Sequence, residues 1–183
     1  PCVDNGLLTL ACCKGGKIIN KNPCATGYRF WIGSNRDKDY KKEDIYLLGT
    51  FHDKFLYIAK VTQVLTMDEY YSSKSKGRLD DIYSLKDNRL VRNKKLAAEC
   101  VHTDENQIKK DLAGKYVILS DDFIYLGRDA AEIDIVADNN PKRQEPKYIT
   151  GPLAEDIIKA CYRFKDTKNH TPTNPIHRSC NQK

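Results

Sequence analysis

The chain has 183 residues, of which 40% are hydrophobic and 31% charged, and its formal net charge is +6. This length suffices for one domain with its own core, and no stretch reaches the roughly 20 apolar residues that a membrane span needs. The first residues lack the basic and apolar regions of a secretory signal peptide. We therefore expect a cytoplasmic protein with no membrane partner.

The charges are segregated along the chain. The segment KDNRLVRNKK (86–95) carries five basic residues and one acid, whereas acids prevail over 121–138. This distribution predicts a basic surface patch that favours polyanionic partners. The alternative is a solvated face without a function.

Cysteine and histidine spacing argues against a metal site. The seven cysteines include no CxxC pair, and the four histidines are scattered and unpaired with them. Zinc sites usually need closely spaced ligand pairs, and secreted disulfide frameworks usually need an even cysteine count. We expect no metal and partly buried free thiols.

Four strands are predicted in the N-terminal third. The first is 6–12, followed by a loop punctuated by glycine and proline, and the second is the aromatic segment 28–35. Segments 45–51 and 54–65 follow as strands, with His52-Asp53 as the tight turn of a hairpin.

The middle of the chain mixes helix and strand signals. Thr66 and Glu69 match a capping box and predict a short helix through Tyr70 and Tyr71. Segments 96–101 and 108–112 are weaker helical candidates. Segments 116–120 and 123–127 are predicted to pair as a hairpin around Asp121-Asp122.

The C-terminal part is predicted as loop, helix and tail. Residues 137–150 read as a loop, and Gly151-Pro152 opens a helix whose apolar face is formed by Leu153, Ile157, Cys161 and Phe164. Residues 166–183 have no hydrophobic period and are predicted to be extended or disordered, which leaves 1–165 as a single domain.

These elements predict an α+β fold with a mixed, largely antiparallel sheet or a partly closed small barrel, flanked by a few helices. The barrel alternative includes PUA-like arrangements. Because there is no G-x-G-x-x-G and no Walker sequence, the Rossmann and P-loop folds lose their main support.

Candidate catalytic residues lie at Cys12, Cys13 and Lys14. Neighbouring residues on a strand point to opposite faces, so at most one of the two thiols lines a given pocket. A nearby lysine lowers a thiol pKa and favours nucleophilic attack. No histidine partner is identifiable, and buried thiols are the alternative.

Candidate ligand-binding residues lie at Trp31, Ser34, Asn35 and Arg36. An indole or guanidinium plane stacks on a base while neighbouring polar groups bind its edge. The alternative is that Trp31 belongs to the core.

Two further clusters contain acidic and aromatic residues. Asp80 and Asp81, followed by Tyr83, could bind a metal, bind a base edge or cap a helix, of which loop capping is the simplest. Phe123 and Tyr125 share one strand face, as a core or as a stacking platform.

Taken in order, five blocks resemble the nucleotide modification associated domain 2 family, Nmad2. They are LTLACCK, WIGS, YIAKVTQVLTMDEYY, DDIY and DLAGKYVILSDDFIYLG, and they span most of residues 1–135. The chain departs from the family pattern in two places. The usual Cys-Lys-Pro is Cys13-Lys14-Gly15 here. The chain also starts inside the region where the family has an N-terminal strand, which leaves open whether an edge strand is missing. The resemblance implies a role in the chemistry of nucleotide or DNA bases, in phage or bacterial DNA modification or defence.

The resemblance is compatible with three classes of function. In the first, the domain binds a modified base or nucleotide, with Trp31, Tyr57 and Tyr125 stacking. Ser34, Asn35 and Asp81 would bind base edges, with Arg36 and Tyr83 beside them, and a basic surface would hold phosphate.

In the second class the same pocket modifies a nucleobase or nucleotide, using Cys12 or Cys13 with Lys14 and Asp81. The third class is a protein-interaction module of a defence or counter-defence system. Binding is favoured because no nucleophile–base pair is recognisable. No cofactor can be assigned, and the base, the polymer and the oligomeric state stay open.

Overall fold

A computed structural model of the chain describes residues 1–12, 15–20, 22–35, 44–93, 104–141 and 147–167. Its strands are β1 (Cys2–Asp4), β2 (Leu7–Leu10), β3 (Lys17–Ile19), β4 (Asn22–Cys24), β5 (Tyr46–Phe51), β6 (Lys54–Lys60), β7 (Gln63–Thr66), β8 (Tyr83–Lys86), β9 (Arg89–Arg92), β10 (Tyr116–Ser120) and β11 (Phe123–Tyr125). Its helices are α1 (Tyr28–Ser34), α2 (Met67–Ser73), α3 (Glu105–Ala113), α4 (Asp134–Asn139) and α5 (Pro152–Tyr162), with short 3₁₀ helices η2 (Gly127–Asp129) and η3 (Lys165–Thr167). The predicted α+β class is confirmed.

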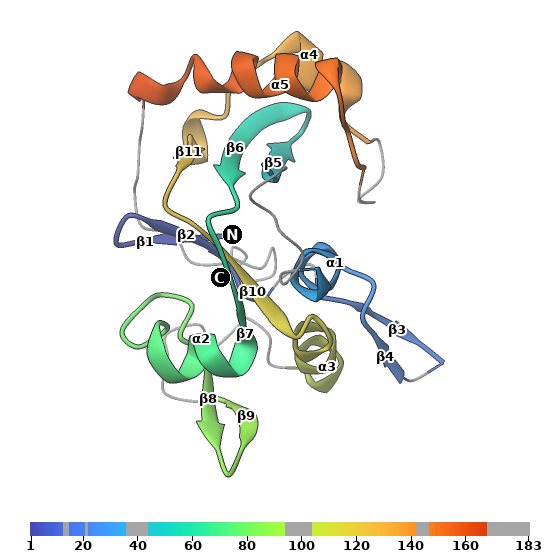
Figure 1. Ribbon diagram of the computed structural model, residues 1–183, viewed down its shortest axis with the longest axis vertical. Helices are drawn as coiled ribbons and strands as arrows, with labels where there is room; N and C mark the ends of the chain where they lie inside the picture. Colours follow the sequence, from blue (N-terminus) through green and yellow to red (C-terminus); the bar gives the residue numbers. More distant parts are fainter. Residues whose placement is uncertain (13–14, 21, 36–43, 94–103, 142–146, 168–183) are drawn as a thin grey trace, which may run out of the picture.

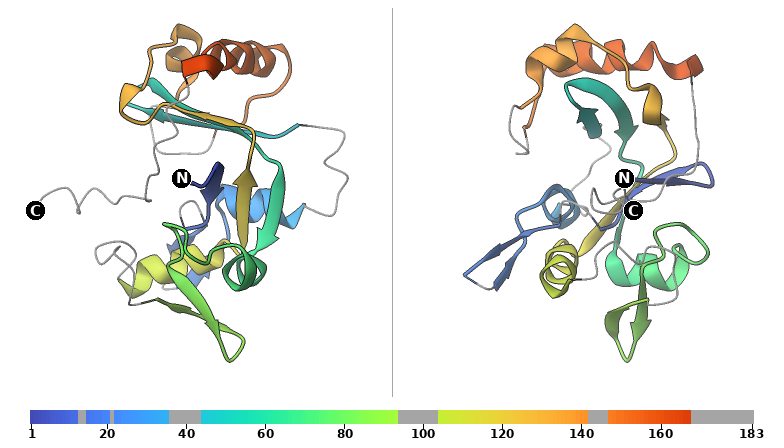
Figure 2. Two further views of the ribbon diagram at one scale, coloured as in Figure 1. Left: turned by 90° about the vertical axis from the view of Figure 1, so that its left-hand side faces the viewer. Right: turned by 180° about the vertical axis from the view of Figure 1, so that it is seen from behind.

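Two antiparallel sheets form the centre of the molecule. A four-stranded sheet has the order β1-β2-β10-β7, and a three-stranded sheet has the order β11-β6-β5. In Figure 1 the layers run from α4 and α5 at the top, through the smaller and then the larger sheet, to α2 and the β8–β9 hairpin at the bottom. The side view in Figure 2 shows the same order. The sheets are not closed into a barrel, so the antiparallel prediction is confirmed and the barrel alternative is wrong.

A bent two-stranded ribbon connects the two sheets. The segment predicted as one strand over 54–65 breaks at Val61-Thr62 into β6 and β7, which lie in different sheets. Opposite this break, the backbone amide of Lys60 donates to the carbonyl of Asp122 (2.9 Å), and the amide of Thr62 donates to that of Leu119 (3.0 Å). The backbone pairing therefore continues through the bend.

The predicted hairpin between 116–120 and 123–127 is wrong. β10 pairs with β2 and β7, whereas β11 pairs with β6. The bend at Asp121-Asp122 carries the chain from one sheet to the other, and its partner strand bends with it. The predicted hairpin of β5 and β6 is confirmed. Both of its turn residues have a positive φ, 48° at His52 and 63° at Asp53, which is the conformation that the common two-residue hairpin turn requires.

Three hydrophobic clusters fill the spaces between the layers, and the alternation of strand residues supplies them. Ile118 of β10 and Phe123 of β11 join the cluster between the two sheets and α1. Val117 and Leu119 face α2, and Ile124 faces α4 and α5. Each sheet is therefore apolar on both faces, which explains why the strands read as near-continuous apolar runs.

The segment 28–35, predicted as a strand, instead forms helix α1 (Tyr28–Ser34) with Asn35 as its C-cap. Arg29, Ile32 and Gly33 are its buried residues, and their spacing of three and one matches one face of a helix. The aromatic and β-branched composition suggested a strand, but burial of this face against β10 decides the outcome.

Other elements were predicted with mixed success. The capping box of α2 is present in both directions, α3 covers the candidate at 108–112, and α5 begins at Pro152 as expected. Ile157 and Cys161 are buried, but Leu153 is 38% exposed and is not part of the apolar face. The hairpins β3–β4 and β8–β9 and helix α4 lie where loops or no element were predicted. The candidate helix at 96–101 lies outside the described residues.

Candidate functional site

Three aromatic side chains gather at the outer side of α1. Trp31 is 49% exposed and Tyr148 55% exposed. Their ring centroids lie 5.1 Å apart with the planes tilted by 51°, and Tyr28 meets the Tyr148 ring edge-on at 5.8 Å. We call Tyr28, Trp31 and Tyr148 the aromatic surface. Large exposed rings in contact with one another offer flat apolar area to a ligand.

Local sequence places two of the three rings. Tyr28 and Trp31 are three residues apart on α1, so they lie on the same side of the helix. The third ring comes from the segment before α5, where the backbone amide of Lys147 donates to the hydroxyl oxygen of Tyr28 (3.1 Å). This bond holds Tyr148 beside the helix. Burial raises the pKa of Tyr28, so its hydroxyl stays protonated at neutral pH.

The buried Arg29 fixes α1 to the rest of the molecule. Its Nη1 donates to the carbonyl of Tyr116 (2.7 Å), and its Nη2 donates to the carbonyl of Asp111. Gly15 and Gly114 lie against the guanidinium, since a Cβ at either position would come within 2.5 Å of Nη2. A buried charge needs such partners, and these ones join α1 to the turn between α3 and β10.

Ser34 and Asn35 serve the end of this helix. The Ser34 hydroxyl and the Asn35 amide both donate to the carbonyl of Trp31, at 3.1 and 2.8 Å. Free carbonyls at a helix C-terminus need such partners. Both side chains are therefore engaged by the backbone of the helix turn that carries Trp31. Arg36, predicted to act with them, lies outside the described residues.

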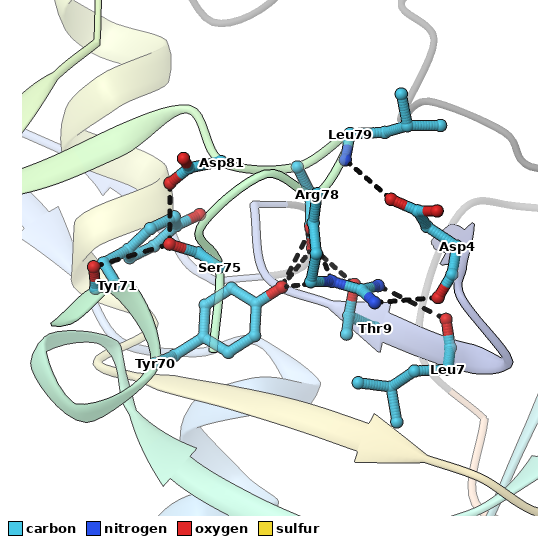
Figure 3. A network of polar contacts seen from close by, with 10 residues as sticks. Asp4, Leu7, Thr9, Tyr70, Tyr71, Ser75, Arg78, Leu79 and Asp81 are labelled. Carbon is cyan, nitrogen blue, oxygen red and sulfur yellow. Dashed lines mark hydrogen bonds and ion pairs between the residues drawn. The ribbon is translucent and has the colours of Figure 1, made fainter. Parts of the chain in front are cut away.

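A second polar centre, the Asp80 network, is buried between α2 and the larger sheet (Figure 3). The Tyr70 hydroxyl donates to both carboxylate oxygens of Asp80 (2.8 and 2.9 Å), and Thr9 donates to one of them. Arg78 lies 3.2 Å from the same carboxylate and donates to the carbonyls of Asp4 (2.8 Å) and Leu7 (3.3 Å). The Asp80 carboxylate is thus paired and hydrogen-bonded, and it joins the loop before β8 to strands β1 and β2.

Electrostatics in this network favour neutral hydroxyl and thiol groups. Burial, followed by the charge of Asp80, raises the pKa of Tyr70 well above its ordinary value. The same two causes raise the pKa of Cys2 to about 12. Neither group supplies an anion near neutral pH, so this centre is suited to holding the fold together.

The predicted Asp81 and Tyr83 follow Asp80 in the chain, and both have structural partners. Asp81 accepts a hydrogen bond from the buried Ser75 hydroxyl (2.6 Å), which caps the loop after α2. Tyr83 is fully buried and donates to Asp111 (2.9 Å). Asp111 in turn connects Tyr83 to Arg29, because its carbonyl accepts from the Arg29 guanidinium. Tyr83 itself does not reach the aromatic surface.

Cys12 lies in the core cluster behind this network. It is 3% exposed and packs among Tyr70, Tyr71 and Tyr83. Among the described residues, the buried hydroxyl of Tyr71 in the same cluster has no hydrogen-bond partner. Cys13 and Lys14 lie outside the described residues.

Tyr125 and Tyr57 are separated from the aromatic surface. They face each other across β11 and β6 and pack against the cluster between the sheets. The predicted binding residues are therefore not one constellation: Trp31, Ser34 and Asn35 lie together, and Asp81, Tyr83 and Tyr125 lie elsewhere. Tyr148 and Arg29 were missed. A helical reading of 28–34 would have shown Arg29 on the buried face, but no local signal marks Tyr148.

The described residues offer neither a membrane-spanning helix nor a group of metal ligands. No helix in them is long and apolar enough to cross a bilayer. Within the same ranges, no group of three or more histidine, cysteine, aspartate or glutamate side chains is placed to hold a metal ion.

Comparison with known proteins identifies a family for the chain. A family model described as "Nucleotide modification associated domain 2" (Nmad2) matches residues 1–179. It covers nearly the whole chain, including α5, which lies beyond the blocks that carry the resemblance. No curated protein and no solved structure matches the chain.

Proposed function

Because the chain belongs to the Nmad2 family, as its ordered sequence blocks predicted, we propose that it binds a nucleobase, as a nucleotide or within a nucleic acid, on the aromatic surface. The family description associates the domain with nucleotide modification, so modified bases in DNA-modification or defence systems are the proposed context. The observation that carries the proposal is the pair of exposed, touching rings of Trp31 and Tyr148.

Stacking supplies the binding energy in this proposal. Every base has a π-face, and a base stacked on an aromatic side chain contributes about 1–3 kcal/mol. Trp31 and Tyr148 lie at a tilt of 51°, so a base can stack on one ring while its edge meets the other. Near Tyr148 the Lys147 ammonium donates to the carbonyl of Asn139 (2.9 Å) and adds positive charge beside the rings.

Catalysis is less well supported by the described residues. Cys12 is enclosed in the core, and Asp81 is engaged by Ser75. A nucleophile must be within hydrogen-bond reach of its base and open to substrate, and neither residue combines the two. Binding is therefore the function proposed, and modification of the base is the alternative for the test below.

Replacement of Trp31 by alanine tests the proposal. We expect affinity for a panel of nucleoside monophosphates to fall by about 5- to 150-fold, as loss of one stacked base implies. Isothermal titration calorimetry gives the affinity, and thermal unfolding checks that the variant is folded. Trp31→Phe keeps a ring and should retain most of the affinity.

Phe51 provides a matched control. It is 52% exposed on β5, in the smaller sheet, so Phe51→Ala removes a similar exposed ring away from α1. Unchanged binding by Trp31→Ala, or an equal loss with Phe51→Ala, would falsify the assignment of the site. Mass spectrometry of the same panel after incubation separates the alternatives, since turnover of any member contradicts a function of binding alone.

A further inference from the structure

A groove lies beside the turn from α3 to β10, the turn to which Arg29 fixes helix α1. It is open to solvent, has a volume of about 570 Å³, and lies between the start of α2, strand β9 and the turn from α3 to β10. Leu90, Leu112 and the Tyr116 ring supply its walls. Arg89, Lys115 and Asp68 also line it, so cations outnumber acids.

The two cations are available to a ligand. Arg89 and Lys115 are exposed, and in the ranges that the structure describes neither side chain is ion-paired. Lys115 lies over the Phe30 ring, 5.7 Å from its centroid. A cation over an aromatic face keeps its charge and can still bind an anion.

Lys115 is held in an uncommon backbone conformation. Its φ is +55°, a region that few side chains other than asparagine and aspartate adopt readily. Its amide donates to the carbonyl of Leu112 (3.1 Å), and its carbonyl accepts from the amide of Met67 (2.9 Å). The backbone bonds therefore fix the direction in which this lysine leaves the turn.

The groove and the aromatic surface are joined through α1. Phe30, next to Trp31 on this helix, lies 6.3 Å from the Tyr116 ring that lines the groove. The buried Arg29 bonds to the backbone of the turn that carries Lys115. Aromatic rings and cations thus follow one another from Tyr148 across α1 to Lys115 and then to Arg89 on the β8–β9 hairpin, which projects at the bottom of Figure 1.

We infer that this surface binds a single-stranded polynucleotide, with bases on the aromatic surface and backbone phosphates at Lys115 and Arg89. The inference rests on the proposed function and extends it from one base to a strand. Rings that take the faces of unpaired bases, beside cations that follow the backbone, are the usual means of binding single strands. A duplex hides its base faces and leaves the rings without a partner.

The test compares ligands of different length on the full chain. The probes are deoxythymidine monophosphate, an oligodeoxythymidylate and an oligouridylate of about ten nucleotides, and a DNA duplex of the same length. We expect both oligonucleotides to bind at least tenfold more tightly than the mononucleotide and more tightly than the duplex. The DNA and RNA probes then show which backbone is preferred.

Lys115→Asn with Arg89→Gln tests the phosphate contacts. Asparagine tolerates the left-handed backbone at position 115, so the turn is kept while the charge is lost. We expect the double variant to bind the oligonucleotide at least tenfold more weakly and the mononucleotide within twofold of the original. The slope of log affinity against log salt should flatten by about 1.4, or 0.7 for each lost phosphate contact.

Lys159→Gln is the control for loss of charge, because Lys159 is exposed on α5 at the other end of the molecule (Figure 1). Equal weakening by this control, an unchanged salt slope or preference for the duplex overturns the inference. So does an equal loss for the mononucleotide, which would place its own phosphate at Lys115. In each case Trp31→Ala still reports separately on the proposed function, and failure of the original chain to bind any probe overturns both.

Discussion

Gly33 decides how closely helix α1 approaches strand β10. A Cβ added at this position would lie 2.1 Å from Cγ of Tyr116. This separation is so short that a small shift of the Tyr116 side chain cannot relieve the overlap. The Tyr116 ring occupies this space and also faces Phe30 and the groove. The smallest residue of the helix therefore sets the position of the rings on it.

Gly33→Ala is expected to destabilise the protein. Alanine normally favours a helix by about 1 kcal/mol over glycine, but the overlap with Tyr116 should reverse the sign and cost about 1–3 kcal/mol of unfolding free energy. Chemical denaturation measures the change. Ser34→Ala, at an exposed position of the same helix, should change stability by less than about 1 kcal/mol, and a more stable Gly33→Ala variant contradicts the packing described.

The motif that contains Arg78 and Asp80 has a structural role. Adjacent acids and a tyrosine, Asp80-Asp81 and Tyr83, suggested contact with a base or a metal. The Asp80 carboxylate is satisfied by Thr9, Tyr70 and Arg78 in the interior. Its partner Thr9 is 71 residues away, so spacing alone could not distinguish a site from a buried network.

At the scale of elements, helix α2 follows directly from local sequence. The Thr66 hydroxyl accepts from the amide of Glu69 (3.2 Å), and the Glu69 carboxylate accepts from the amide of Thr66 (2.6 Å). Both contacts lie within three residues, and this explains why the capping box could be recognised without the fold.

Thr66→Ala is expected to reduce the unfolding free energy by about 0.5–2 kcal/mol, the usual contribution of an N-cap side chain. Thr66→Ser keeps the hydroxyl and should stay within about 0.5 kcal/mol of the original, because serine caps as well as threonine. Urea denaturation of the three proteins gives the values. Equal losses in both variants would show that the threonine methyl group, and not the cap, is responsible.

The strands of the ribbon were harder to predict than the helices. Segment 54–65 begins with apolar residues on both faces, and polar residues enter around the bend, at Lys60, Thr62 and Gln63. Such a polar stretch fits a strand that leaves the core as well as one that changes sheet, so it does not by itself reveal the bend. The hydrogen bonds opposite it, to Asp122 and Leu119, come from a strand about sixty residues later in the sequence.

At the scale of the whole molecule, buried thiols make the free energy of unfolding depend on pH in the alkaline range. Burial raises the pKa of Cys161, between α5 and the smaller sheet, to about 12, and that of Cys2 also reaches about 12. In the unfolded chain a thiol titrates at about 8.5. Between these values the unfolded state loses a proton that the folded state retains, so the folded state becomes less favoured as pH rises.

We expect the unfolding free energy to be constant with respect to these thiols below about pH 8 and to fall above about pH 9, with up to about 1.4 kcal/mol per pH unit from each thiol. Urea denaturation over this pH range measures the slope. Cys161→Ala should be less stable at pH 8, because it loses packing, but its stability should decline less steeply. Parallel curves for the two proteins contradict the assignment to Cys161.

The domain boundary and the location stay predictions. The described residues end at 167, so the predicted tail over 166–183 lies almost wholly outside them, and the proposal of one domain over 1–165 awaits limited proteolysis of the full chain. The basic segment 86–95 is described as far as residue 93, and there it forms the β8–β9 hairpin that carries Arg89.

The sequence by itself determined the family, the α+β class, the hairpin at His52-Asp53, the capping box and helix α5. Each of these rests on residues close together in the chain or on the order of blocks along it. Only the tertiary structure decided that 28–34 is a helix, that Arg29 holds it to Tyr116, 87 residues away, and that Tyr148 completes the aromatic surface. The physical reason is that burial and hydrogen-bond partners between distant segments are determined by packing, which local propensity and spacing do not encode.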